Sequence, residues 1–152
     1  MVDSTTWLEI GRNIVTILGF PALVYTLYRA HRDNIGRNTI WLIDYVNNEY
    51  NRTARHRVRH VVSKKAPNEL TDDDVHDCEV VITSYDVAGW LARSRLIDKK
   101  MFFTGWGPSI VDAYDNTKPV LRTMRSKLGG SHSEGFLHAY DLARRHMRQQ
   151  PR

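Results

Sequence analysis

An uncharged run of fifteen residues, 14–28 (IVTILGFPALVYTLY), constrains the fold of this chain more than any other stretch. As a helix it would cover roughly 22 Å at about 1.5 Å per residue, which is less than the ~30 Å hydrocarbon core of a bilayer. Extension back to Trp7 gives residues 7–28 and about 33 Å. This extension includes Glu9 and Arg12, which lie three residues apart and can pair or reach toward lipid headgroups.

Three interpretations of this run are open, and a membrane-anchoring helix is favoured. Trp7 at one end and Tyr25 and Tyr28 at the other suit the two interfaces of a bilayer. Membrane helices also tolerate a proline such as Pro21. The second interpretation is a buried helix of a soluble protein, since short apolar runs are often core helices. The third, a cleaved secretory signal, fits poorly because the start MVDSTTWLE has no basic leader and no small-residue cleavage site follows.

Basic residues beside the run predict the orientation of such an anchor. Arg29, Arg32 and Arg37 follow the run, whereas only Arg12 precedes it. Because cytoplasmic flanks carry the excess of positive side chains, the C-terminal part is expected in the cytoplasm and the short N-terminus outside. The lone Cys78 agrees, since one cysteine forms no intrachain disulfide.

The net charge of +5 conceals four blocks of alternating sign. Residues 1–28 carry a net charge of −1, residues 29–65 carry +6, residues 66–115 carry −6 and residues 116–152 carry +6. We therefore expect the acidic middle to pack against the basic segments. In particular, the basic segment 52–65 should lie antiparallel beside the acidic residues 72–79, since only a short loop joins them.

Helical periodicity dominates the remainder of the chain. Apolar residues at spacings of three and four predict a helix over 38–62, separated from the N-terminal helix by a break or bend at Gly36. Thr71 is a predicted N-cap for a helix to about Arg95, and the acidic residues 72–74 suit its first turn. We expect this amphipathic helix to be central, with Ile82 in the core.

The C-terminal third predicts three further helical pieces and no strand. Asp98 should cap a short helix over 99–104, which a break at 105–108 ends. Pro108 can start the next helix, which should kink or restart near Pro119 and stop at Gly129. A last helix is expected over 134–149. The predicted fold is all-α: an N-terminal membrane-anchor helix in residues 1–30, then a compact bundle of about four to five helices in residues 31–152.

Three segments carry a resemblance to a known family: YDVAGWLARSRLIDKKMF, VDAYDNTKPVLRTMRSKLG and GFLHAYDLAR. Within them, Leu91 before the Leu96-Ile97-Asp98 corner, the Lys118-Pro119 pair and the Tyr140-Asp141-Leu142 ending stand out. The chain resembles the bacterial domain-of-unknown-function family numbered 4760 over about residues 10–147. The resemblance implies an N-terminal hydrophobic helix followed by a helical region, and it implies no catalytic residue or ligand.

No side-chain cluster predicts an enzyme, a metal site or a cofactor. His56 and His60 are four residues apart, but basic neighbours would repel a cation, so a solvated helix face is favoured. Cys78 falls on an apolar stripe and is interpreted as a small core residue. His138 and Asp141 share a face of the last helix, yet the sequence marks no nucleophile or pocket beside them.

The basic segment 52–65 is the one candidate functional surface. Its side chains could be solvated or paired internally, could bind anionic lipid, or could bind nucleic acid. We expect a bacterial inner-membrane protein with a single pass over residues 7–28 and a cytoplasmic domain that acts as a protein-interaction module. The alternative is a soluble, basic, helical nucleic-acid-binding protein. The candidate anion-binding residues are Arg52, Arg55, Arg57, Arg59, Lys64 and Lys65.

Overall fold

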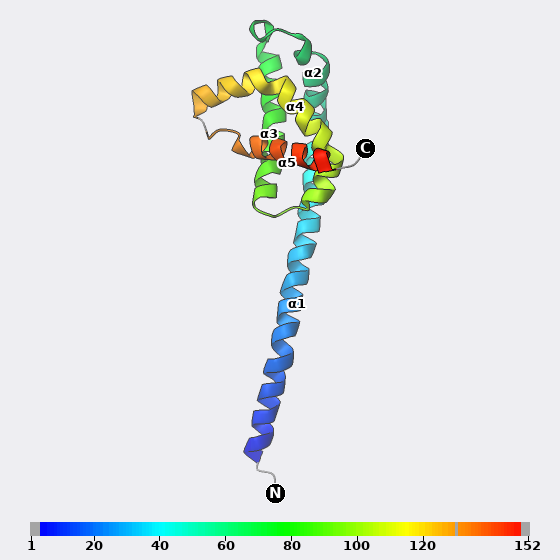
Figure 1. Cartoon of the computed structure of the whole chain (residues 1–152), viewed down its shortest axis with the longest axis vertical. Helices are drawn as coiled ribbons and strands as arrows, with labels where there is room; N and C mark the ends of the chain where they lie inside the picture. The colour runs from blue at the N-terminus through cyan, green and yellow to red at the C-terminus, as the bar shows by residue number, and fades with distance from the viewer. Residues whose placement is uncertain (1–3, 130, 150–152) are drawn as a thin grey trace. The chain divides into compact units, whose positions relative to one another are not determined.

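The structure is a computed structural model that describes residues 4–129 and 131–149, with side chains described from residue 23 onward. The chain divides into two compact units, Met1–Asn34 and Ile35–Arg152. The described residues form five α-helices, which are labelled in Figure 1: α1 (Ser4–Asn47), α2 (Glu49–His60), α3 (Asp72–Arg93), α4 (Lys99–Leu128) and α5 (Glu134–Gln149). Two single-turn 3₁₀ helices, Val62–Lys64 and Pro67–Glu69, connect α2 to α3. The described residues contain no strand, so the all-α prediction is confirmed.

The predicted anchor lies in α1. None of the helices in the described part of the chain is both long enough and apolar enough to cross a membrane. The side chains of Trp7, Glu9, Arg12 and Pro21 lie outside the described ones. A spanning role for residues 7–28 therefore stays a prediction.

The boundary between α1 and α2 differs from the predicted one. Of the two alternatives expected at Gly36, a break or a bend, the break is wrong, because α1 continues through it to Asn47. One glycine in a helix costs only about 1 kcal/mol relative to alanine, too little to interrupt a long helix. The chain breaks instead at Asn48, whose side chain accepts a hydrogen bond from the Asn51 backbone N–H at 2.8 Å and so caps α2. The helix predicted over 38–62 is thus two helices.

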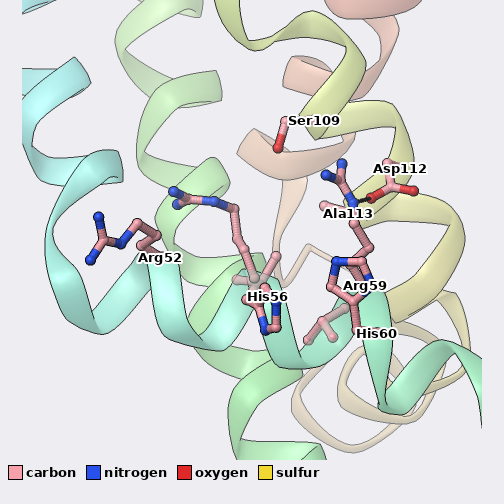
Figure 2. Close-up of a pocket in the computed structure, with 10 residues that line it drawn as sticks. Arg52, His56, Arg59, His60, Ser109, Asp112 and Ala113 are labelled. Carbon is pink, nitrogen blue, oxygen red and sulfur yellow. Dashed lines mark hydrogen bonds and ion pairs between the residues drawn. The ribbon is translucent and has the colours of Figure 1, made fainter.

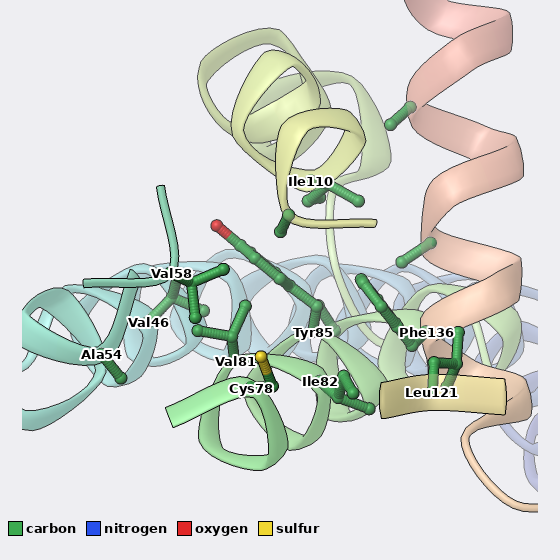
Figure 3. Close-up of a cluster of buried hydrophobic side chains, with 14 of the residues drawn as sticks. Val46, Ala54, Val58, Cys78, Val81, Ile82, Tyr85, Ile110, Leu121 and Phe136 are labelled. Carbon is green, nitrogen blue, oxygen red and sulfur yellow. The ribbon is translucent and has the colours of Figure 1, made fainter. Parts of the chain in front are cut away.

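α3 is the central helix of the second unit, as predicted, and it packs against α2, α4 and α5. Thr71 caps it by accepting a hydrogen bond from the Asp74 backbone N–H, which confirms the predicted start. Ile82 and Tyr85 are completely buried. Figure 3 shows them beside Cys78 and Val81, with Phe136 of α5 packing against the same cluster.

α4 is one continuous helix, so the break predicted at 105–108 is wrong, and of the two alternatives at Pro119, a kink or a restart, the restart is wrong. A proline inside a helix leaves the carbonyl four residues earlier without its N–H donor. Here those carbonyls belong to Thr104 and Asp115, which are exposed residues, and water can satisfy a free carbonyl on an exposed side of a helix. The helix begins after the predicted cap Asp98, whose side chain accepts from the Met101 N–H at 3.0 Å.

Two glycines allow α5 to cross α3 at close range. A Cβ atom placed on Gly89 would lie 1.7 Å from the carbonyl oxygen of Gly135, and one placed on Gly135 would lie 2.2 Å from the carbonyl oxygen of Asp86. The Asp86 carboxylate also accepts a hydrogen bond from the Phe136 N–H at 2.9 Å. Backbone contact at Gly89 therefore sets the position of α5, whose predicted bounds of 134–149 are confirmed.

We predict that Gly89→Ala destabilises the protein although alanine has the higher helix propensity. The new methyl group overlaps the backbone of α5, and such overpacking typically costs about 1–3 kcal/mol or more. Gly105→Ala is the matched control, because a Cβ there meets nothing within 4 Å and alanine should add about 0.5–1 kcal/mol. Thermal unfolding of both variants measures the difference. Equal stability of the two variants would contradict the close crossing of α3 and α5 at Gly89.

Candidate anion-binding site

The six predicted basic residues do not form one surface. Arg57 and Lys65 lie against the acidic start of α3. Arg52, Arg55 and Arg59 line a pocket between α2 and α4 instead. The sixth, Lys64, is exposed on the 3₁₀ helix Val62–Lys64 and does not line this pocket.

Asp74 is the acceptor on which the first group converges. Its carboxylate is fully buried and lies 2.5 Å from the Lys65 ammonium. It also accepts hydrogen bonds from the Thr71 backbone N–H at 3.0 Å and the Thr71 hydroxyl at 2.9 Å. The hydrogen bond from Lys65, followed by that from the Thr71 N–H, lowers the pKa of Asp74 to about 2.

Arg57 bridges two acidic residues of α3. Its guanidinium lies 3.1 Å from Asp77 and 3.7 Å from Asp74. Partial burial raises the pKa of Asp77, and the charge of Arg57 opposes this shift. The predicted packing of the basic segment against residues 72–79 is therefore confirmed. Asp72 and Asp73 are exposed, whereas Asp74 is the buried acceptor.

The pocket between α2 and α4 collects the remaining basic side chains (Figure 2). Its volume is about 180 Å³, and its lining includes Arg52, Arg55 and Arg59 together with the imidazoles of His56 and His60. The centres of the two imidazole rings are 4.5 Å apart. All five residues come from three turns of one helix, so α2 presents a cationic face to this space.

Arg55 is the most constrained of the pocket arginines. It donates a hydrogen bond to the Val46 carbonyl oxygen at 2.5 Å, and its guanidinium lies 4.9 Å from the centre of the Trp106 ring. Burial lowers the pKa of Arg55 from its ordinary value. Because a guanidinium has five N–H donors, these contacts leave donors for another acceptor.

α4 contributes the polar groups on the other side. Arg59 donates to the Asp112 carboxylate at 2.7 Å, and both side chains are roughly half exposed. Ser109 Oγ lies 2.9 Å from the hydroxyl of the fully buried Tyr85. Burial raises the pKa of Tyr85, so this hydroxyl keeps its proton and can donate to Ser109.

Two other candidate residues, Cys78 and His138, gain no chemical role from the structure. Cys78 is fully buried, and burial raises the pKa of its thiol to about 12, so it is a core residue as predicted. His138 is half-buried, and burial lowers its pKa. Within the described residues, no group of three or more His, Cys, Asp or Glu side chains could hold a metal ion.

The family model described as "Domain of unknown function (DUF4760)" matches residues 13–145. The chain belongs to this family. The match confirms the resemblance carried by the three quoted segments, and it covers residues 13–28 of the predicted anchor, the pocket and the core of the helical unit. Neither a curated protein nor a solved structure matches the chain.

The sequence pointed to the basic segment but missed the contributions of α4. Ser109 and Asp112 lie about fifty residues from α2 along the chain, and no local pattern marks them as its partners. His56 and His60 are exposed, as a solvated helix face requires, but they also border the pocket. Only the spacing at 52, 55–56 and 59–60 marks a common helix face.

We predict that Asp74→Asn reduces acid sensitivity as well as stability. The pKa of Asp74 in the folded chain is about 2, below its ordinary value of 3.8. Its contribution to stability is therefore complete above about pH 4 and is lost as the pH falls from about 4 to about 2. Melting temperatures across that range should fall less steeply for the variant than for the original chain.

Asp73→Asn is the matched control for this measurement. Asp73 lies in the same turn but is exposed and has no ion pair among those of the described residues. The control should keep the acid dependence of the original chain. If Asp74→Asn also keeps it, Asp74 is not the group whose protonation loosens the α2–α3 contact.

Proposed function

We propose that this DUF4760 protein is a membrane-attached helical protein whose folded domain binds a protein partner. The proposal rests on the exposed apolar surface of α1. Leu23 is 56% exposed, Leu27 is 62% exposed and Tyr28 is 63% exposed. They end an uncharged run of fifteen residues, and the side chains of this run that the structure describes, from residue 23 onward, are all exposed. Such a contiguous apolar surface favours burial in lipid or in a partner.

Lipid is the better match for this surface because of what flanks it. Arg29 and Arg32 follow directly and are exposed, and tyrosines occupy the end of the run, as at a bilayer interface. In this proposal residues 7–28 span the bacterial inner membrane once. The helical unit lies in the cytoplasm.

A second exposed aromatic surface supports the interaction role. Trp41 stacks on Tyr45, with ring centres 5.4 Å apart, while remaining 53% exposed. The neighbouring Ile40 is 56% exposed. Rigid aromatic side chains of this kind are enriched at protein–protein interfaces. We propose that this part of α1, in the second unit, contacts the protein partner.

The nucleic-acid alternative has less support. Arg57, Arg59 and Lys65 lie in ion pairs with carboxylates, so half of the six candidate residues are already partly neutralised. The described structure offers no row of aromatic side chains along α2 on which bases could stack. Among the six candidate residues, Arg52, Arg55 and Lys64 remain without a carboxylate in the ion pairs of the described residues.

Extraction with alkaline carbonate tests membrane attachment. The original full-length chain should stay with the membrane pellet, and the double variant Leu23→Asp, Leu27→Asp should be released. A charged residue inside a spanning helix costs about 2.5–3.5 kcal/mol near the centre and less toward the ends. Leu128→Asp is the control, because Leu128 is 65% exposed on α4 and should not affect fractionation. Release of the original chain would refute the attachment.

Reporter fusions test the orientation. A reporter active in the cytoplasm and fused after Arg152 should give signal, and one active in the periplasm should not. The expected result follows from the excess of arginines after the run. Replacement of Arg29, Arg32 and Arg37 by Glu should weaken this preference. The opposite pattern of signals in the original chain would reverse the proposed orientation.

A further inference from the structure

The pocket between α2 and α4 has more positive charge than its own carboxylate can neutralise. Asp112 is the acidic residue among its lining side chains, and it is paired with Arg59. Arg52 and Arg55 have no carboxylate partner among the ion pairs of the described residues. Two arginines that line the pocket therefore have no counter-charge among the ion pairs of the described residues.

The donors around this space are of the kind that recognises an oxyanion. Guanidinium groups bind carboxylates and phosphates through paired N–H donors. Arg55 is held by Val46 and Trp106, so its orientation is fixed before any ligand arrives. If the Tyr85 hydroxyl donates to Ser109 Oγ, the hydroxyl hydrogen of Ser109 remains for the ligand.

The size of the pocket favours a small ligand over a polymer. Its volume of about 180 Å³ is roughly ten times the ~15 Å³ that a single water needs on the same kind of measure. That space accepts a phosphate group with a short attachment. The apolar side chains of Val58, Val81 and Ala113 close its floor.

We propose that the α2–α4 pocket is a binding site for a phosphate group, held by Arg52 and Arg55, with Ser109 donating from the opposite wall. The Arg59–Asp112 pair closes one side of the site (Figure 2). The phosphate belongs either to a small soluble compound or to a lipid headgroup. This site does not depend on the proposed membrane attachment, since every residue in it belongs to the second unit.

Isothermal titration of the detergent-purified full chain tests the site with two probes. Inorganic pyrophosphate represents a free phosphate, and dihexanoyl phosphatidic acid below its micelle concentration represents a lipid headgroup. The original chain should bind at least one probe with a stoichiometry of one. Arg52→Gln should weaken that binding roughly tenfold to a hundredfold, because it removes a charge-assisted contact. The probe that binds more tightly identifies the source of the phosphate.

Arg122→Gln is the matched control, since Arg122 is an exposed arginine of α4 that does not line the pocket. It removes the same charge and should leave the affinity unchanged within about twofold. Equal weakening by both variants would show diffuse attraction to a basic protein and would overturn the proposal. Failure of the original chain to bind either probe would also overturn it.

Ser109→Ala gives an independent measurement within the pocket. It removes the hydroxyl without changing charge, and it should weaken binding while the salt dependence stays that of the original chain. Its melting temperature identifies any loss of folding, since Tyr85 would lose its hydrogen-bond partner. A folded variant with unchanged affinity for the bound probe would remove Ser109 from the site and contradict the proposed geometry.

Discussion

The burial of the Asp74 carboxylate determines how the two sides of α2 are used. Lys65, Arg57 and Thr71 all converge on this group, and they hold the end of the α2–α3 connection against the start of α3. Successive residues of a helix are about 100° apart, so Arg57 points roughly 140° away from Arg52. Once Arg57 faces α3, the side chains at 52, 55 and 59 must face α4. The basic lining of the pocket therefore follows from the direction that Arg57 takes on α2.

Local chemistry made much of the fold predictable. The caps at Thr71 and Asp98 and the stop at Gly129 follow from side chains that satisfy free backbone groups, or from a glycine that adopts a positive φ of 104°. Pro108 misled the prediction because tolerance of a proline depends on whether the carbonyl of Thr104 reaches water. The role of Gly89 could not be predicted, since only the position of Gly135 explains why alanine is excluded there.

The candidate site was predictable only as a charge pattern. The alternating blocks correctly indicated that basic residues 52–65 lie against the acidic start of α3. The charge blocks could not predict that Arg57 faces α3 while Arg52 faces α4, because the net charge of a segment does not say on which side of the helix each residue lies. They also assigned the contact to Asp72 and Asp73 equally, whereas only Asp74 is placed to act both in the cap and as a buried acceptor. Contributions from Ser109 and Asp112 depend on how α4 packs.

The pocket has buried apolar residues at its floor and exposed basic residues at its opening. The floor residues are buried because α2 and α4 both pack against α3 there. Val58 of α2, Val81 of α3 and Ala113 of α4 are each nearly inaccessible to solvent, so the three helices share one buried contact beneath the cavity. Arg52, His56 and His60 above it are exposed and make no ion pair with the described residues. Substitutions of the exposed residues at the opening should therefore change ligand binding without destabilising the fold. Changes at the floor alter both, because the same side chains that close the pocket also join α2 and α4 to the central helix.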